Sequence, residues 1–115
     1  MQRFDTGVRH SELDRARPRA VETPWGVFAL YCVGEEILAA QAFCPHLDGP
    51  LFEGTLRGDE IVCPWHQWRY SLRTGRRVGI GALVVPGTGS ALLLADVETS
   101  TAGTIVLSNP RRGAR

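Results

Sequence analysis

The sequence carries two short patches that combine cysteine and histidine, and each follows directly on a run of strand-forming residues. Cys44 and His46 form the first patch, and Cys63 and His66 form the second. The spacing is C-x-H, then sixteen residues, then C-x-x-H. Loops that leave the ends of strands can face one another, so the two patches can offer two thiolates and two imidazoles to one metal centre. A fold that brings these two strand ends together would place all four donors at one centre.

This donor set suits either a tetrahedral zinc ion or a [2Fe–2S] cluster. Zinc fingers usually pair their cysteines in one motif and their histidines in another. Here each loop brings one cysteine and one histidine instead. A binuclear cluster can use that pattern, with both thiolates on one iron and both imidazoles on the other. The spacing favours the cluster, and a zinc-binding structural or interaction module stays open as the alternative from another class.

Thirteen glycines and seven prolines divide the 115 residues into short pieces, and strand-like runs lie between them. Many short strands with turns between them predict a single all-β domain over residues 1–115. We expect a loose stretch over 79–90, a short helix over 11–17 and a frayed tail over 109–115. The expected strands are 20–23, a hairpin of 27–33 with 36–43, a hairpin over 54–62 that turns at Gly58-Asp59, and the final pair 92–98 and 104–108.

Other features of the chain argue against several function classes. Three cysteines, an odd number, do not indicate a disulfide framework. Cys32 lies within a strand-like run, and we expect it to be a small buried core residue. No apolar run is long enough for a membrane span, and the first residues lack an apolar leader segment, so we expect the protein in the cytoplasm. We also expect a monomer. Outside the segment that follows the second patch, basic stretches interleaved with aromatic residues are lacking, which argues against nucleic-acid binding.

Two segments resemble the cluster motif of the Rieske iron–sulfur family. They read CPHLDGPL over 44–51 and CPWHQWRY over 63–70, and LRTG over 72–75 resembles the segment that follows the second loop. The resemblance implies an all-β Rieske domain, with an antiparallel sandwich-like or barrel-like base and a small inserted cluster-binding subdomain at about 43–75. It also implies one [2Fe–2S] cluster per chain. By position, Cys44 and Cys63 would bind the inner iron, and His46 and His66 the outer, more exposed iron.

Histidine ligation should raise the reduction potential. In the oxidised core, two ferric ions and two sulfides leave two positive charges, which two thiolates cancel, so an electron enters a neutral site. The range for Rieske centres is about −150 to +300 mV. The high-potential respiratory members carry a disulfide between the positions that correspond to Gly49 and Trp65, and a Ser hydroxyl at the position of Trp68. These absences predict the lower half of the range.

Other residues near the motif carry separate expectations. Tyr70 occupies the position of a family tyrosine, and we expect its hydroxyl to donate a hydrogen bond toward a cysteine sulfur and raise the potential slightly. Gln67 stands where the family most often has glycine, so a backbone conformation that requires glycine is not expected there. Its side chain would lie beside the outer iron.

Two surface features have two interpretations each. Leu47, Pro64 and Trp65 would sit at the loop tips, where they form either an apolar docking patch or a shield over the cluster. Four arginines follow the second loop, and they form either a solvated face or a patch that steers an acidic redox partner. They are Arg69, Arg73, Arg76 and Arg77, and Glu53, Asp59 and Glu60 are the nearby acids that could neutralise them.

The resemblance implies one-electron transfer from a reductase to a terminal oxygenase or a similar oxidoreductase. The setting we expect is the ferredoxin component of a bacterial ring-hydroxylating oxygenase system. Only one histidine, His10, lies outside the motif, and no second metal motif is present, so we expect a non-catalytic component and no self-contained oxygenase. The small subunit of an assimilatory nitrite reductase is the alternative within the same family.

Overall fold

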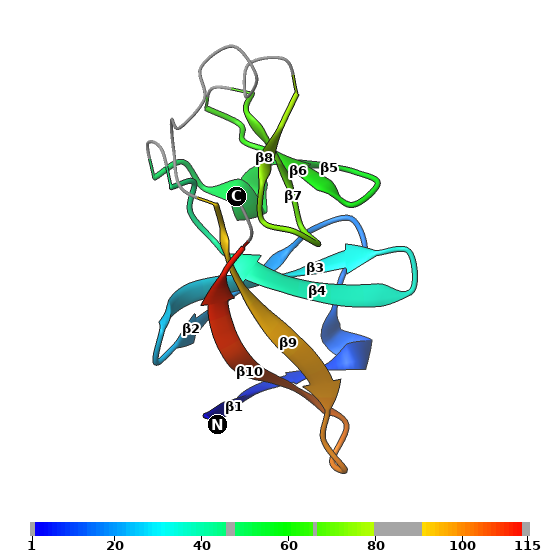
Figure 1. The fold of residues 1–115 in the computed structure, drawn as a ribbon. Helices are drawn as coiled ribbons and strands as arrows, with labels where there is room; N and C mark the ends of the chain where they lie inside the picture. Colours follow the sequence, from blue (N-terminus) through cyan, green and yellow to red (C-terminus); the bar gives the residue numbers. More distant parts are fainter. Residues whose placement is uncertain (1, 46–47, 66, 80–90, 114–115) are drawn as a thin grey trace.

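The computed structural model describes residues 2–45, 48–65, 67–79 and 91–113, and these residues form two antiparallel sheets (Figure 1). The larger sheet is the base, and its strands have the order β1-β10-β9-β4-β3-β2. Its members are β1 (Arg3–Arg9), β2 (Arg19–Thr23), β3 (Gly26–Val33), β4 (Glu36–Gln41), β9 (Leu93–Thr99) and β10 (Thr104–Arg112). The smaller sheet, with the order β5-β6-β7-β8, contains β5 (Thr55–Arg57), β6 (Glu60–Val62), β7 (Arg69–Ser71) and β8 (Arg77–Val78). The all-β prediction is confirmed.

The base sheet curls so that its two edge strands, β1 and β2, contact each other, which gives a nearly closed barrel. Strand β3 lies next to the edge strand β2 in the base sheet, and its central residues, 28–31, are buried on both faces of the strand. Phe28 and Leu30 pack inside the barrel with Ile105 and Leu107. Because side chains alternate along a strand, Ala29 and Tyr31 point to the face opposite to that of Phe28 and Leu30. Tyr31 faces the smaller sheet and joins a second core cluster.

The second core cluster joins the base to the smaller sheet, which the chain inserts between β4 and β9. It contains Tyr31 from the base together with Leu51, Ile61, Tyr70 and Leu72 from the insertion. Cys44 and Cys63 belong to the same cluster and are fully buried. Figure 1 shows the smaller sheet on the side of β3 and β4 that lies away from the turn between β9 and β10.

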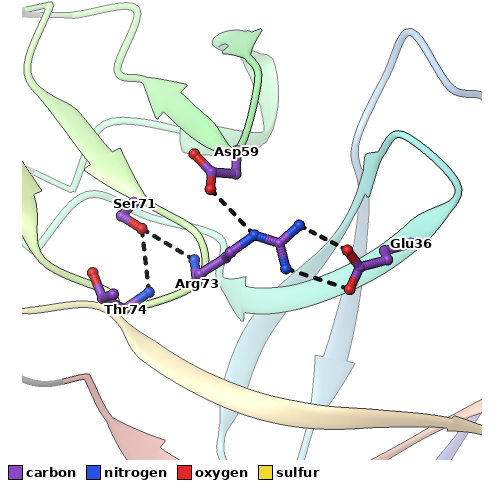
Figure 2. Close-up of polar contacts among 5 residues, drawn as sticks. All are labelled: Glu36, Asp59, Ser71, Arg73 and Thr74. Atoms are coloured by element: carbon purple, nitrogen blue, oxygen red, sulfur yellow. Dashed lines mark hydrogen bonds and ion pairs between the residues drawn. The ribbon is translucent and has the colours of Figure 1, made fainter.

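Arg73 ties the two sheets together at their shared surface (Figure 2). Its guanidinium donates to both carboxylate oxygens of Glu36, at the start of β4, with a shortest distance of 2.7 Å. Its Nε donates to Asp59, in the β5–β6 turn, at 3.2 Å. The Ser71 hydroxyl accepts from the backbone N–H groups of Arg73 and Thr74, which holds the turn after β7 in place.

Both predicted hairpins are confirmed, and the β5–β6 turn has Gly58 at a φ of 63°. The predicted helix over 11–17 is wrong: a single 3₁₀ turn, His10–Glu12, is followed by a bridge between Asp14 and Arg17. The Asp14 carboxylate accepts from the N–H of Ala16, and such local hydrogen bonds compete with helix formation. Apart from Gly79, the loose stretch predicted over 79–90 lies outside the described residues.

The frayed tail predicted over 109–115 is wrong for 109–112, because β10 continues to Arg112, and 114–115 lie outside the described residues. The pairing between β9 and β10 shifts register between Ser108 and Arg111. Asn109 has a φ of 54° there, and the irregularity accommodates Pro110, which cannot donate to the sheet. Strands β1, β7 and β8 are not among the strands expected from the sequence. Among the described residues, no helix is long and apolar enough to cross a membrane.

Candidate metal centre

The two cysteine loops share one backbone hydrogen-bond pattern. In the first loop, the Cys44 N–H donates to the Gly49 carbonyl at 2.7 Å, and the Asp48 N–H donates to the Cys44 carbonyl at 2.8 Å. In the second loop, the Cys63 N–H donates to the Trp68 carbonyl at 2.8 Å, and the Gln67 N–H donates to the Cys63 carbonyl at 3.0 Å. Each loop therefore closes back on its own cysteine in the same way.

The fourth residue after each cysteine takes the left-handed conformation that this closure requires. Asp48 has a φ of 58° and Gln67 a φ of 64°. The expectation that Gln67 avoids a backbone conformation favouring glycine is therefore wrong. The loop imposes the conformation through its two hydrogen bonds, and glutamine bears the steric cost of roughly 1–2 kcal/mol. Where the Gln67 side chain lies relative to the outer iron stays a prediction.

Both loop cysteines are fully buried and neither forms a disulfide. The Sγ of Cys44 lies 3.4 Å from the Tyr70 hydroxyl, so the predicted contact between Tyr70 and a cysteine sulfur is confirmed. Burial raises the pKa of Tyr70 far above its ordinary value, and the contact with Cys44 raises it further. Tyr70 therefore keeps its proton and can donate it. Three predicted residues, His46, Leu47 and His66, lie outside the described residues.

The two loops meet at Gly49. A Cβ placed on Gly49 would lie 2.8 Å from Cys63 Sγ and 3.2 Å from Cδ2 of Trp65, which is closer than packed side chains allow. Only glycine lets the first loop approach the second this closely. A glycine therefore lies against an indole ring where the two loops meet. Trp65 is nevertheless 64% exposed.

Two residues that the sequence analysis missed as site residues support the loops. The Gln41 side chain accepts from the Leu93 N–H and donates to the Phe43 carbonyl, both at 2.7 Å, directly before Cys44. Arg77 places its guanidinium carbon 3.1 Å from the ring centroid of Trp68, whose carbonyl holds the second loop closed. Nothing in the sequence marks these two residues as part of the site, because Gln41 is a single amide within a strand and Arg77 is one of several nearby arginines.

Acids pair with members of the arginine group that follows the second loop. Arg69 lies 3.3 Å from Glu60, and Arg73 pairs with Asp59 and Glu36. Neutralisation by Asp59 and Glu60 is therefore confirmed for Arg69 and Arg73.

Cys32 is not the buried core residue that we expected. It is half-buried at the end of β3, on the wall of a small cavity of about 80 Å³ that His10 and Leu13 also line. Burial raises the pKa of its thiol.

Two buried sulfur donors on matched, contacting loops fit an iron–sulfur cluster, and Tyr70 supplies a hydrogen-bond donor to one of them. The family model described as the Rieske [2Fe-2S] domain matches residues 7–88. The chain belongs to the Rieske [2Fe–2S] domain family. The cofactor of this Rieske domain is accordingly a [2Fe–2S] cluster, and the zinc alternative has no support.

Relatives of this Rieske domain include electron carriers and oxygenases. The ferredoxin component of the p-cumate 2,3-dioxygenase system of Pseudomonas putida is 42% identical over 57 residues, which are 48% of this chain and 48% of that protein. The oxygenase component of 3-ketosteroid-9-alpha-monooxygenase from Rhodococcus rhodochrous is 50% identical over 36 residues, 31% of this chain and 9% of that protein. The chain spans less than half the length of these curated relatives.

The fold has a solved counterpart. A chain in the complex of reduced oxygenase and oxidized ferredoxin in carbazole 1,9a-dioxygenase superposes with a TM-score of 0.77 at 25% identity, over 98% of this chain and 97% of that chain.

Proposed function

We propose that this Rieske domain is a one-electron carrier in which Cys44, Cys63, His46 and His66 hold the cluster. The observation that carries the proposal is the pair of buried thiols on matched loops that meet at Gly49. Cys44 and Cys63 would hold the inner iron, and the two histidines the outer iron. When bound, the cluster supplies reversible one-electron redox chemistry.

The chain's own residues would protect and tune that electron site. The second core cluster excludes water from Cys44 and Cys63, and Tyr70 presents its proton to the Cys44 sulfur. Trp65 remains exposed on the second loop, beside the contact between the loops. We assign the loop edge with Trp65 as the surface where redox partners dock.

The partners we propose are a reductase as donor and a terminal oxygenase as acceptor. The likeness to the p-cumate 2,3-dioxygenase ferredoxin component and to a chain in a solved oxygenase–ferredoxin complex supports this choice. The domain itself would be a non-catalytic component. Elution as a monomer supports a diffusing carrier, whereas stable co-purification with a larger reductase would favour a permanent subunit, as in an assimilatory nitrite reductase.

The composition of the chain offers matched controls for the ligand assignment. It has three cysteines and three histidines, of which Cys32 and His10 are outside the proposed set. Substitution of any of the four ligands, cysteine to serine or histidine to alanine, should abolish the visible and EPR spectra or change their shape. Cys32→Ser and His10→Ala should leave both spectra unchanged.

Dithionite titration of the purified chain should consume one electron and produce a rhombic EPR signal with an average g below 2. A colourless protein that contains zinc would contradict the proposal, as would spectra that survive the loss of a proposed ligand.

A further inference from the structure

The smaller sheet turns one arginine toward the cysteine loops. In β7 and β8, Tyr70 lies directly opposite Arg77, and Arg69 lies directly opposite Val78. Residues that face each other across two strands point to the same side of the sheet, and neighbours along a strand point to opposite sides. Arg77 therefore shares the face of Tyr70, which contacts the Cys44 sulfur. Arg69 lies on the other face.

Trp68 holds the charge of Arg77 in this position. The guanidinium carbon is 3.1 Å from the centroid of the Trp68 ring, and the Nε atom of Arg77 is buried. An aromatic face attracts a cation through its quadrupole without neutralising the charge. The backbone carbonyl of the same Trp68 accepts the N–H of Cys63. The cation is thus attached to the second cysteine loop through one residue.

Arg77 shares the sheet face of Tyr70, whose hydroxyl is 3.4 Å from the Cys44 sulfur. A charge that appears at the cysteine sulfurs would therefore lie in the field of this guanidinium. A partly buried charge is screened by salt much less than an exposed one.

We propose that Arg77 tunes the reduction potential of the cluster upward through its fixed positive charge. The inference rests on the proposed function, because it requires a cluster that takes up one electron. Reduction changes the ligated core from neutral to singly negative, and a nearby cation stabilises the negative state.

The neighbouring arginine offers a matched control. Arg76 carries the same charge one residue earlier but is exposed to solvent. The test is a potentiometric titration of the cluster-loaded chain at low and high salt, for the wild type, Arg77→Gln, Arg77→Met, Arg77→Lys and Arg76→Gln. EPR spectra check that the ligand set is unchanged.

We expect a lower midpoint potential in Arg77→Gln and Arg77→Met that persists at high salt. Arg77→Lys should keep most of the wild-type potential because it keeps the charge. Arg76→Gln should shift the potential less, and that shift should vanish at high salt.

An unchanged potential in both neutral variants would overturn the proposal. A fall in Arg77→Lys as large as in Arg77→Gln would also overturn it, because stacking and not charge would then matter. A wild-type chain without a reversible one-electron couple would instead contradict the proposed function itself.

Discussion

The hydroxyl of Tyr70 lies 3.4 Å from the Sγ of Cys44, inside the core cluster that joins the two sheets. A cysteine that binds iron is a thiolate and has no proton to give, so the tyrosine must be the donor in this contact. The raised pKa of Tyr70 keeps that proton in place at neutral and alkaline pH.

Replacing Tyr70 by phenylalanine should lower the reduction potential. The hydrogen bond stabilises the reduced, more negative cluster more than the oxidised one. A difference of about 0.5–1.5 kcal/mol between the two states corresponds to a fall of roughly 20–65 mV for one electron. Potentiometric titration measures it. Tyr31→Phe is the matched control, because Tyr31 is equally buried but its hydroxyl donates to the Gln41 carbonyl. Equal potentials in Tyr70→Phe and the wild type would refute the role of this bond.

Replacing Gly49 by alanine should weaken cluster retention. The new Cβ would lie 2.8 Å from Cys63 Sγ, and a sulfur that is bound to iron cannot move aside. Overpacking of this kind costs about 1–3 kcal/mol, so the loops should separate. Iron per chain and the temperature of visible bleaching should both fall. Gly58→Ala is the control: its φ of 63° strains alanine, but no atom lies within 4 Å, so cluster content should be unchanged.

Replacing Gln67 by glycine should stabilise the protein by about 0.5–1 kcal/mol. The left-handed backbone costs a side-chain-bearing residue roughly 1–2 kcal/mol, and the greater chain entropy of glycine offsets about half of that gain. The bleaching temperature should rise by a few degrees. Asp48→Gly should give a smaller rise, because aspartate tolerates this conformation better. A loss of stability in Gln67→Gly would mean that the side chain makes contacts worth more than the strain.

The ion pair of Glu36 with Arg73 should make stability depend on pH. The hydrogen bonds from Arg73, and then its charge, hold the pKa of Glu36 below its ordinary value of 4.5. A lowered folded pKa means that the stabilisation is complete above pH 4.5 and is lost as the pH falls through the folded value.

Glu36→Gln should therefore be less stable than the wild type at neutral pH and equally stable in acid. Thermal unfolding followed by circular dichroism measures the difference, which should also shrink at high salt because both groups are exposed. Glu35→Gln is the control, because it removes the same charge one residue earlier. The acids that pair with Arg73 are Glu36 and Asp59. A pH-independent gap between Glu36→Gln and the wild type would contradict this explanation.

Replacing Trp65 by alanine should slow electron transfer with a partner and leave the potential unchanged. An exposed tryptophan at the centre of an interface typically contributes enough that its loss weakens binding roughly tenfold or more. Stopped-flow reduction of the chain by NADH and the reductase of a ring-hydroxylating dioxygenase system measures the effect. An unchanged rate with a lower bleaching temperature would favour the shield interpretation of this residue.

The sequence alone determined the chemistry of the site and the short hairpins. Two Cys-Pro patches at strand ends carry their donor chemistry in the residues themselves, and the family comparison confirms the cluster. The β3–β4 and β5–β6 hairpins follow from local turn residues and strand formers, which act over only a few positions. Such local interactions can be read directly from the order of the residues.

The tertiary structure decided what depends on distant partners. Strand β1 exists because it pairs with β10, and the Thr6 hydroxyl bonds to the carbonyl of Ile105, 99 residues away. The left-handed Gln67 follows from the closure of a whole loop on Cys63, against the local preference of glutamine. The pairing of β7 with β8 puts Arg77 on the sheet face of Tyr70 and Arg69 on the opposite face, which the order of the residues alone does not determine. Packing and strand register determine these features, and both depend on residues that lie far apart in the sequence.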